Sequence, residues 1–277
     1  MHRFFLTLAA LFIAETALAA PIWIERRFVP EAELVDPRYT TIDETSETVV
    51  DHTAWAAFLS AYVRVAEVGP NRVAYGSVSD ADRAALDGYL DALQTVDVAG
   101  LAREEALAYW INLYNAATIA LVLDAYPIEG IRKINVDGDG PWDTPVATVS
   151  GRALTLNEIE HGIIRPVFKD ERIHYAVNCA SVGCPSLAIE PFEGARLDAQ
   201  LDAAARAYVN DPRGVAIEDG DLTVSKIFGW YREDFAPDEA GVVDYLKSYA
   251  EPALAAALDG FDDIDGYAYD WSLNDAP

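Results

Sequence analysis

Residues 101–126 read LAREEALAYWINLYNAATIALVLDAY and form the most distinctive segment of the chain. Apolar residues occupy almost every side of a helix drawn through this stretch, and Pro127 forbids its continuation. A helix that is apolar all round is buried all round. The sequence therefore predicts a central buried helix over residues 101–126. Asn112 and Asn115, three apart in this helix, must then be hydrogen-bonded, either to neighbouring loops or at a cleft.

Helices are also predicted before and after this segment. The spacing of Trp55, Phe58 and Tyr62 is typical of an amphipathic helix that begins near Asp51. Capping signals predict two further helix starts, at Ser79 with Asp82 and at Thr155 with Glu158. Three later helices are expected from apolar periodicity: one carrying Leu197, Leu201 and Tyr208, one near 238–249 and one near 252–258.

Strand signals are short and lie in the second half of the chain. Residues 130–153 read as turns with short strands, and the alternation in 173–177 predicts a strand with Ile173, Tyr175 and Val177 on one face. Val215–Ile217 and Leu222–Val224, separated by a turn, predict a hairpin, and Tyr267, Tyr269 and Trp271 alternate in a strand-like tail. We therefore expect an α+β fold in a single compact domain, mainly helical with short strands and a hairpin.

The N-terminus has the organisation of a targeting segment. Arg3 follows Met1 and His2, residues 4–14 are apolar, and Ala17-Leu18-Ala19 is a small-residue cleavage motif. We predict a signal peptide over residues 1–19, cut after Ala19, an extended lead-in over 20–50 and a single domain over 51–277. The mature protein is expected to be periplasmic or secreted. No later stretch reads as a transmembrane span, so none is predicted after cleavage.

The charge balance excludes some classes of partner. The chain has 46 acidic residues against 20 Lys and Arg, a formal net charge of −26. Such a chain repels phosphate backbones and anionic lipid, so we predict no nucleic-acid partner. An unidentified small molecule or peptide remains as the expected partner, and no cofactor is predicted.

The chain has two cysteines, Cys179 and Cys184, five positions apart. In an oxidising compartment an even, closely spaced pair is first of all a disulfide candidate. A metal site is a weaker interpretation, because His161, His174 and the two cysteines lack the close cysteine pair of zinc sites. The loop 135–140 resembles half of a calcium loop, but Val146 occupies the position of its bidentate glutamate. No metal site is predicted.

The residues that could carry chemistry cluster between 158 and 184. A thiol becomes a nucleophile only beside a base, and the base needs an orienting partner. Cys179 with His161 or His174, oriented by Glu160 or Asn178, meets that requirement. We therefore consider a thiol-dependent acyl or amide hydrolase or transferase. Substrate contacts are expected from two guanidinium groups and three amides: Arg165, Arg172, Asn112, Asn115 and Asn178.

The alternative is a non-catalytic binding or structural module. In that case Cys179 and Cys184 form a bridge, and the histidine and asparagine side chains satisfy buried polar contacts. A reduced Cys179 of depressed pKa beside a histidine would favour the enzyme, and an oxidised pair would favour the module.

Several blocks of sequence, in order between residues 100 and 235, resemble the family catalogued as domain of unknown function 547. They are YWINLYN (109–115), LNEIEHGIIR (156–165), ERIHYAVNCAS with CP (171–181, 184–185) and SKIFGWY with DF (225–231, 234–235). The resemblance implies no agreed activity, only an analogy with papain- and transglutaminase-like cysteine enzymes. It marks as family hallmarks Glu160-His161, Arg172, His174 and Asn178-Cys179. In those enzymes the cysteine precedes the histidine, whereas here both histidines precede Cys179.

Overall fold

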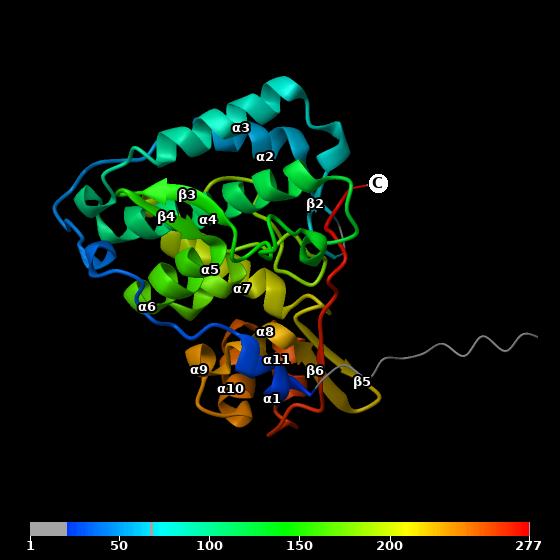
Figure 1. Cartoon of the computed structure of the whole chain (residues 1–277). Helices are drawn as coiled ribbons and strands as arrows, with labels where there is room; N and C mark the ends of the chain where they lie inside the picture. The colour runs from blue at the N-terminus through cyan, green and yellow to red at the C-terminus, as the bar shows by residue number, and fades with distance from the viewer. Residues whose placement is uncertain (1–20, 67–68, 277) are drawn as a thin grey trace, which may run out of the picture.

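The computed structural model describes residues 21–66 and 69–276. The predicted signal peptide and its cut after Ala19 lie outside the described residues. Over these residues the chain folds as predicted into a mainly helical α+β structure with three small sheets. Figure 1 shows most of the helices in an upper part of the molecule, and the β5–β6 hairpin with the last helices in a lower part.

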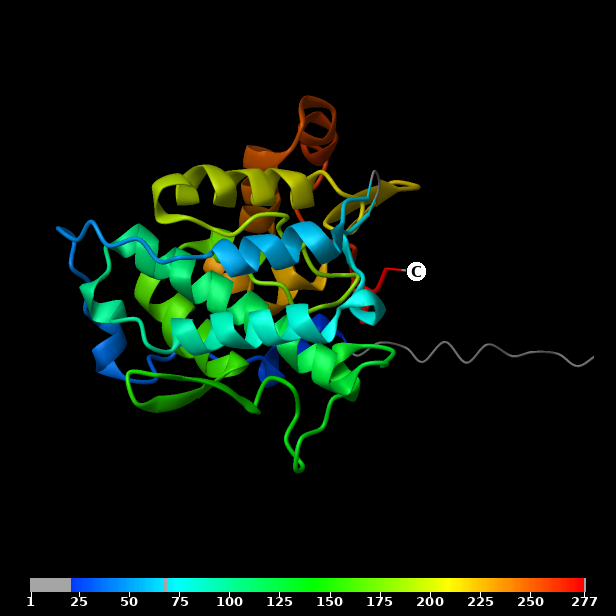
Figure 2. The same ribbon diagram turned by 90° about the horizontal axis from the view of Figure 1, so that it is seen from above.

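Helix α4 (Arg103–Ala125) is the centre of the upper part and confirms the predicted buried helix. It is buried from Glu105 to Val122 and ends before Pro127. Two antiparallel neighbours, α2 (Thr53–Tyr62) and α3 (Asp80–Leu93), lie side by side over one of its faces (Figure 2). The Ser79 side chain accepts a hydrogen bond from the Asp82 backbone N–H, so the predicted cap of α3 is present.

Length and composition alone would allow α4 to cross a membrane, although no transmembrane span was predicted after the signal peptide. Its most apolar window is 94% buried inside the protein. A helix that protein covers on every side has no face left for lipid, so α4 is the core helix of this fold.

One antiparallel pair of strands precedes α4 in the chain and another follows it. Strands β1 (Val63–Arg64) and β2 (Arg72–Val73) pair antiparallel, as do β3 (Pro145–Val149) and β4 (Arg152–Thr155). Ser150 and Gly151 both have positive φ, which a two-residue turn of this hand requires. Strand β4 leads directly into α5 (Leu156–Ile159), where Thr155 and Glu158 form the predicted capping box.

The lower part has its own sheet and its own small core. The predicted hairpin is present as β5 (Val215–Glu218) and β6 (Asp221–Ser225), and β7 (Gly266–Ala268) adds to β6 in parallel. The lower part also contains α8 (Lys226–Trp230), α9 (Arg232–Phe235), α10 (Glu239–Tyr249) and α11 (Pro252–Leu258), while α7 (Leu197–Val209) packs against both cores. The periodicity that predicted α7, α10 and α11 is therefore confirmed.

The predicted strand over residues 173–177 is wrong. Residues Glu171–Tyr175 form a 3₁₀ helix, η7, which begins at Asp170 with a side-chain cap on the Arg172 N–H. Ile173 and Val177 pack in the upper core, whereas Tyr175 packs in the lower one. The alternation in the sequence therefore reflects a segment buried between two cores, not one face of a strand.

The ends of the chain join the two parts. The C-terminal segment rises from the lower part to the upper part along one side of the molecule (Figure 1). It pairs through single bridges, Leu273 with Ser181 and Asp275 with Val73. The lead-in contains three short helical turns rather than only extended chain: α1 (Ile22–Glu25), η1 (Arg26–Phe28) and η2 (Pro37–Thr40). Glu25 accepts hydrogen bonds from Lys226 Nζ at 2.5 Å and from Trp230 Nε1 at 2.8 Å, so the lead-in is held against α8.

Because α4 is enclosed on all sides, truncating one of its side chains should leave a cavity. We expect Leu113→Ala, at a fully buried position, to lower the free energy of unfolding by about 2–5 kcal/mol. The exposed Glu104→Ala on the same helix is the control and should change it by less than about 0.5 kcal/mol. Urea unfolding followed by circular dichroism measures both values. Equal effects of the two substitutions would contradict the central role of α4.

Candidate functional site

A cavity of about 310 Å³ lies where the upper and lower parts meet. The upper part contributes Tyr114, Glu160 and His161, and the lower part contributes Trp230, Tyr231 and Tyr269. The lead-in reaches its mouth with Phe28, whose side chain is largely exposed. The further lining residues are Val29, Pro30, Trp142, Asp143, Asn157, His174, Val177, Cys179, Cys184, Pro185, Ile227 and Trp271.

Half-buried aromatic rings form one wall of the cavity. Tyr269 and Trp271 have ring centroids 4.7 Å apart, and Trp230 lies 4.9 Å from Tyr269. Trp142 and Trp271 pack edge to face, with ring centroids 5.8 Å apart. Such clusters offer large, rigid apolar faces to a ligand at little cost in conformational entropy.

Glu160 and His161 lie at the base of the cavity on a π-helical turn, Glu160–Ile164, that continues α5. π turns occur mostly as local widenings of a helix and often at functional sites. Gly162 lets the lead-in approach this turn, because a Cβ there would lie 2.9 Å from the Val35 Cβ. The Val35 N–H donates to the Gly162 carbonyl at 2.9 Å.

Burial lowers the pKa of His161 to about 4, so its imidazole is neutral near neutral pH. The Arg165 guanidinium, which can only donate, lies 3.2 Å from His161 Nδ1. Nδ1 must therefore carry the lone pair, and Nε2 carries the proton. His161 is a hydrogen-bond donor in this state rather than a ready base.

His174 belongs to a buried network with Asp234 and Arg165. The Nε2 atom of His174 lies 2.7 Å from Asp234 Oδ2, and Arg165 donates to both oxygens of Asp234 at 2.6 and 3.0 Å. Burial alone would raise the pKa of Asp234, but the hydrogen bonds from His174 and Arg165 outweigh it and lower the pKa. The ionised carboxylate holds the proton on Nε2 and leaves Nδ1 directed elsewhere.

Glu160 lies between the two histidines. Its Oε1 is 3.9 Å from His161 Nδ1 and 4.0 Å from His174 Nδ1. The hydroxyl groups of Tyr114 and Tyr231 also contact Glu160, and burial raises the pKa of both tyrosines far above its usual value. Both hydroxyls are therefore protonated and neutral beside the carboxylate.

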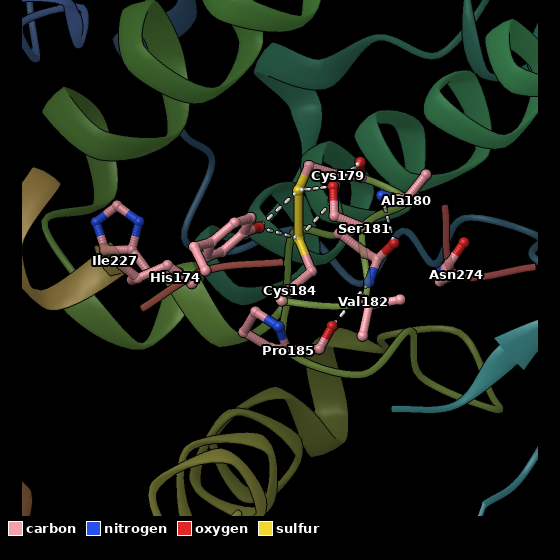
Figure 3. The surroundings of a disulfide bond; sticks show 12 residues. His174, Cys179, Ala180, Ser181, Val182, Cys184, Pro185, Ile227 and Asn274 are labelled. Atoms are coloured by element: carbon pink, nitrogen blue, oxygen red, sulfur yellow. Dashed lines mark hydrogen bonds between the residues drawn. A yellow bond between two sulfur atoms is a disulfide. The ribbon is translucent and has the colours of Figure 1, made fainter. Parts of the chain in front are cut away.

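Cys179 and Cys184 form the disulfide that the sequence predicted, with Cα atoms 6.3 Å apart (Figure 3). The Cys179 N–H donates to Cys184 Sγ at 3.0 Å, and the Tyr269 hydroxyl lies 3.0 and 3.1 Å from the two sulfurs. Cys179 is half-buried and Cys184 buried, and both line the cavity. Among the described residues, no histidine nitrogen hydrogen-bonds to either sulfur.

The guanidinium groups predicted to bind substrate are engaged within the protein. Arg165 pairs with Asp234, as described above, and lies outside the cavity lining. Arg172 pairs with three carboxylates around η7 and the start of α7: Asp170, Asp198 and Asp202.

The predicted amides hold loops around α4. Asn112 donates to and accepts from the backbone of Phe192, at 2.8 and 3.0 Å. Asn115 donates to the Ala176 carbonyl and accepts from the Asn178 N–H. The Asn178 side chain donates to the Pro185 carbonyl and accepts from the Ala180 N–H, which shapes the disulfide loop. All three amides contact the backbone of neighbouring loops. The sequence had allowed either this structural role or substrate binding.

Sequence reasoning missed Asp234 and most of the aromatic wall. Asp234, Trp230 and Tyr231 enter the sequence analysis only within the blocks that resemble the family. The alternation of Tyr269 and Trp271 was the available signal, since it places both rings on one face. In the loop 135–140, Asn135 Oδ1 accepts from the Gly138 N–H, as in an ordinary turn. The described residues contain no cluster of three or more His, Cys, Asp or Glu suited to a metal.

The fold and the cavity define a mainly helical α+β protein with an aromatic-walled cleft beside a disulfide. Residues 98–209 match the family model described as Protein of unknown function, DUF547, which confirms the resemblance inferred from the sequence. The matched region includes Glu160, His161, His174 and both cysteines, whereas Asp234 and most of the aromatic wall follow it. No curated protein and no solved structure matches the chain.

The lowered pKa of His161 makes stability depend on pH. The unfolded chain binds a proton at His161 with a pKa near 6.5, and the folded chain only near 4, so stability rises with pH across this interval and is lost as pH falls. We expect His161 to account for about 2 kcal/mol of the stability lost between pH 7 and pH 5.

Urea unfolding at the two pH values measures this loss. His161→Gln should lose less stability than the natural chain, with the remainder arising in part from His52, whose pKa burial also lowers to about 4. An identical loss in His161→Gln and in the natural chain would contradict the assignment.

Proposed function

We propose that the protein is a binding module that takes a small organic molecule or a short peptide in its aromatic-walled cavity. The observation that carries the proposal is the composition of the cavity: half-buried tryptophan and tyrosine rings form its wall, and Glu160, His161 and His174 form its polar base. Small-molecule sites are concave, mostly apolar and supplied with a few placed polar groups. In this function the Cys179–Cys184 bridge shapes the cavity wall.

Three features support binding over thiol chemistry. The sulfur of Cys179 is already bonded to that of Cys184. His161 carries its proton on Nε2, because Arg165 occupies Nδ1. His174 is held through its Nε2 by Asp234. A nucleophile and its base normally lie within hydrogen-bond reach of each other, and here the sulfurs have Tyr269 as their side-chain neighbour instead.

A thiol-dependent acyl or amide hydrolase or transferase is the second candidate. It is favoured by one observation, that Cys179 lines the same cavity as both histidines. It requires an external thiol to reduce the bridge. Cys179 Sγ would then attack a carbonyl carbon, its proton would pass to a histidine, and the leaving alcohol or amine would take that proton; water or an acceptor nucleophile would then release the acyl group from the thioester.

We also propose a periplasmic or secreted location. The signal-like residues 1–19 support it, and so does the bridge, since disulfides persist in oxidising compartments.

Alkylation of the periplasmically expressed protein, followed by intact-mass measurement, tests the state of the cysteines. We expect no adduct in denaturant without reductant, and two adducts once the chain is reduced, because both sulfurs are consumed in the bridge. The same mass reports whether the chain begins at Ala20, as cleavage after Ala19 predicts.

Alkylation of the native protein without reductant would contradict the bridge. Rapid addition of one equivalent to the native, unreduced protein at pH 6 would show a low-pKa thiol. The thiol mechanism would then replace the binding module if Cys184→Ser retained an activity that Cys179→Ser abolished.

A further inference from the structure

The side chains with a permanent charge that line the cavity are all acidic. Its lining includes two carboxylates, Glu160 at the base and the exposed Asp143 at the mouth. None of the described lining residues is a lysine or an arginine. The described lining also includes two histidines, His161, whose buried imidazole is neutral, and His174. The interior potential of this cleft therefore favours positive charge, in a chain whose formal net charge is −26.

The burial of the Glu160 carboxylate needs a physical explanation. Its side chain is only 8% exposed, and buried carboxylates are normally paired with a cation. Arg165 attracts Glu160 electrostatically but forms no direct ion pair with it, because its guanidinium is bound bidentately to Asp234. Tyr114 and Tyr231 supply neutral hydroxyl groups to Glu160 but no charge. A buried carboxylate with this environment faces the cavity without a permanent counter-ion from the described part of the chain.

The aromatic wall offers the second half of a cation site. The faces of Trp and Tyr rings attract a cation within about 6 Å of the ring centroid, and Trp attracts it best. Two rings of this site already bind a cation that is not part of the cavity lining. Arg132 lies 5.0 Å from the centroid of Trp271, and Arg165 lies 5.0 Å from that of Tyr231. Trp142, Trp230 and Tyr269 have no such neighbour among the described residues.

We propose that the cavity binds an organic cation, an alkylated ammonium group, with Glu160 as its counter-ion and the Trp230 and Tyr269 rings as its aromatic contacts. The inference rests on the proposed binding function and names its ligand class. An alkylated ammonium suits this site better than a metal ion, because its methyl groups fill apolar space while its diffuse charge is only weakly hydrated. A volume of about 310 Å³ suits a small head group, since it lies at the lower end of the range of small-molecule sites.

The test compares two probes of nearly the same shape: choline, which is cationic, and 3,3-dimethylbutan-1-ol, in which carbon replaces the ammonium nitrogen. Titrations are followed by tryptophan fluorescence, since Trp142, Trp230 and Trp271 line the cavity. We expect choline to bind about tenfold or more tightly than the neutral alcohol, a difference of about 1.4 kcal/mol. Glu160→Gln should remove most of that preference, and Trp230→Leu should weaken binding of both probes.

Glu158→Gln is the matched control. It lies two residues before Glu160, outside the cavity lining, and Gln preserves the capping box with Thr155. It should leave the affinity ratio unchanged. Circular dichroism establishes that each variant is folded, and if Glu160→Gln does not fold, the ratio in the natural chain decides alone.

The outcomes separate the two proposals. Equal binding of both probes would overturn the cation inference and leave the binding function standing. If the alcohol bound more tightly than choline, the cation inference would again fail alone. Absence of binding by both probes would overturn the cation inference and remove support for the binding function as well.

Discussion

The burial of α4 on every side is the constraint on which the rest of the structure depends. A helix with 18 consecutive buried positions cannot lie at a surface, so other elements must cover it all round. The helices α2 and α3 cover one face, and the α5 region and the disulfide loop cover others. The polar residues inside α4 then determine how loops approach it: Asn112 binds the backbone at Phe192, and Asn115 binds the backbone on both sides of Val177. Buried amides must find such partners, so the loop before the disulfide has one path beside the helix.

The second constraint joins the two cores. Asp234, from α9 of the lower part, binds Arg165 and His174 from the upper part, and Tyr231 stacks on His174 with ring centroids 4.2 Å apart. This network is the reason that Arg165 is not available to Glu160. The carboxylate at the base of the cavity consequently has no directly bound arginine or lysine among the described residues. A buried ion pair contributes little net stability once the cost of its desolvation is counted. The main effect of this network is to orient His174 and to fix the two cores relative to each other on either side of the cavity.

The sequence predicted the elements better than the site. Helical periodicity, capping boxes and the hairpin turn are local signals, and α3, α5, α7, α10 and the β5–β6 hairpin all follow them. The segment 173–177 was wrongly predicted as a strand because every residue in it is buried, so no alternation between core and solvent exists to be read. The candidate residues Glu160, His161, His174 and Cys179 do meet in one cavity. No local sequence pattern indicates that His174 contacts Asp234, 60 positions away, or that Cys179 contacts Tyr269, 90 positions away.

By itself the sequence determined the central helix, the α+β class and the resemblance to the family of unknown function, and it favoured the pairing of two cysteines five residues apart. These depend on periodicity, on motifs and on short separations along the chain. Only the tertiary structure decided which polar groups are engaged with one another and which face the cavity. Arg165 and Arg172 are equally basic in the sequence, and both are bound by aspartates in the fold. Whether a charge is paired is a property of distances between segments that are remote in sequence, and such distances are set by packing of the two cores, not by local pattern.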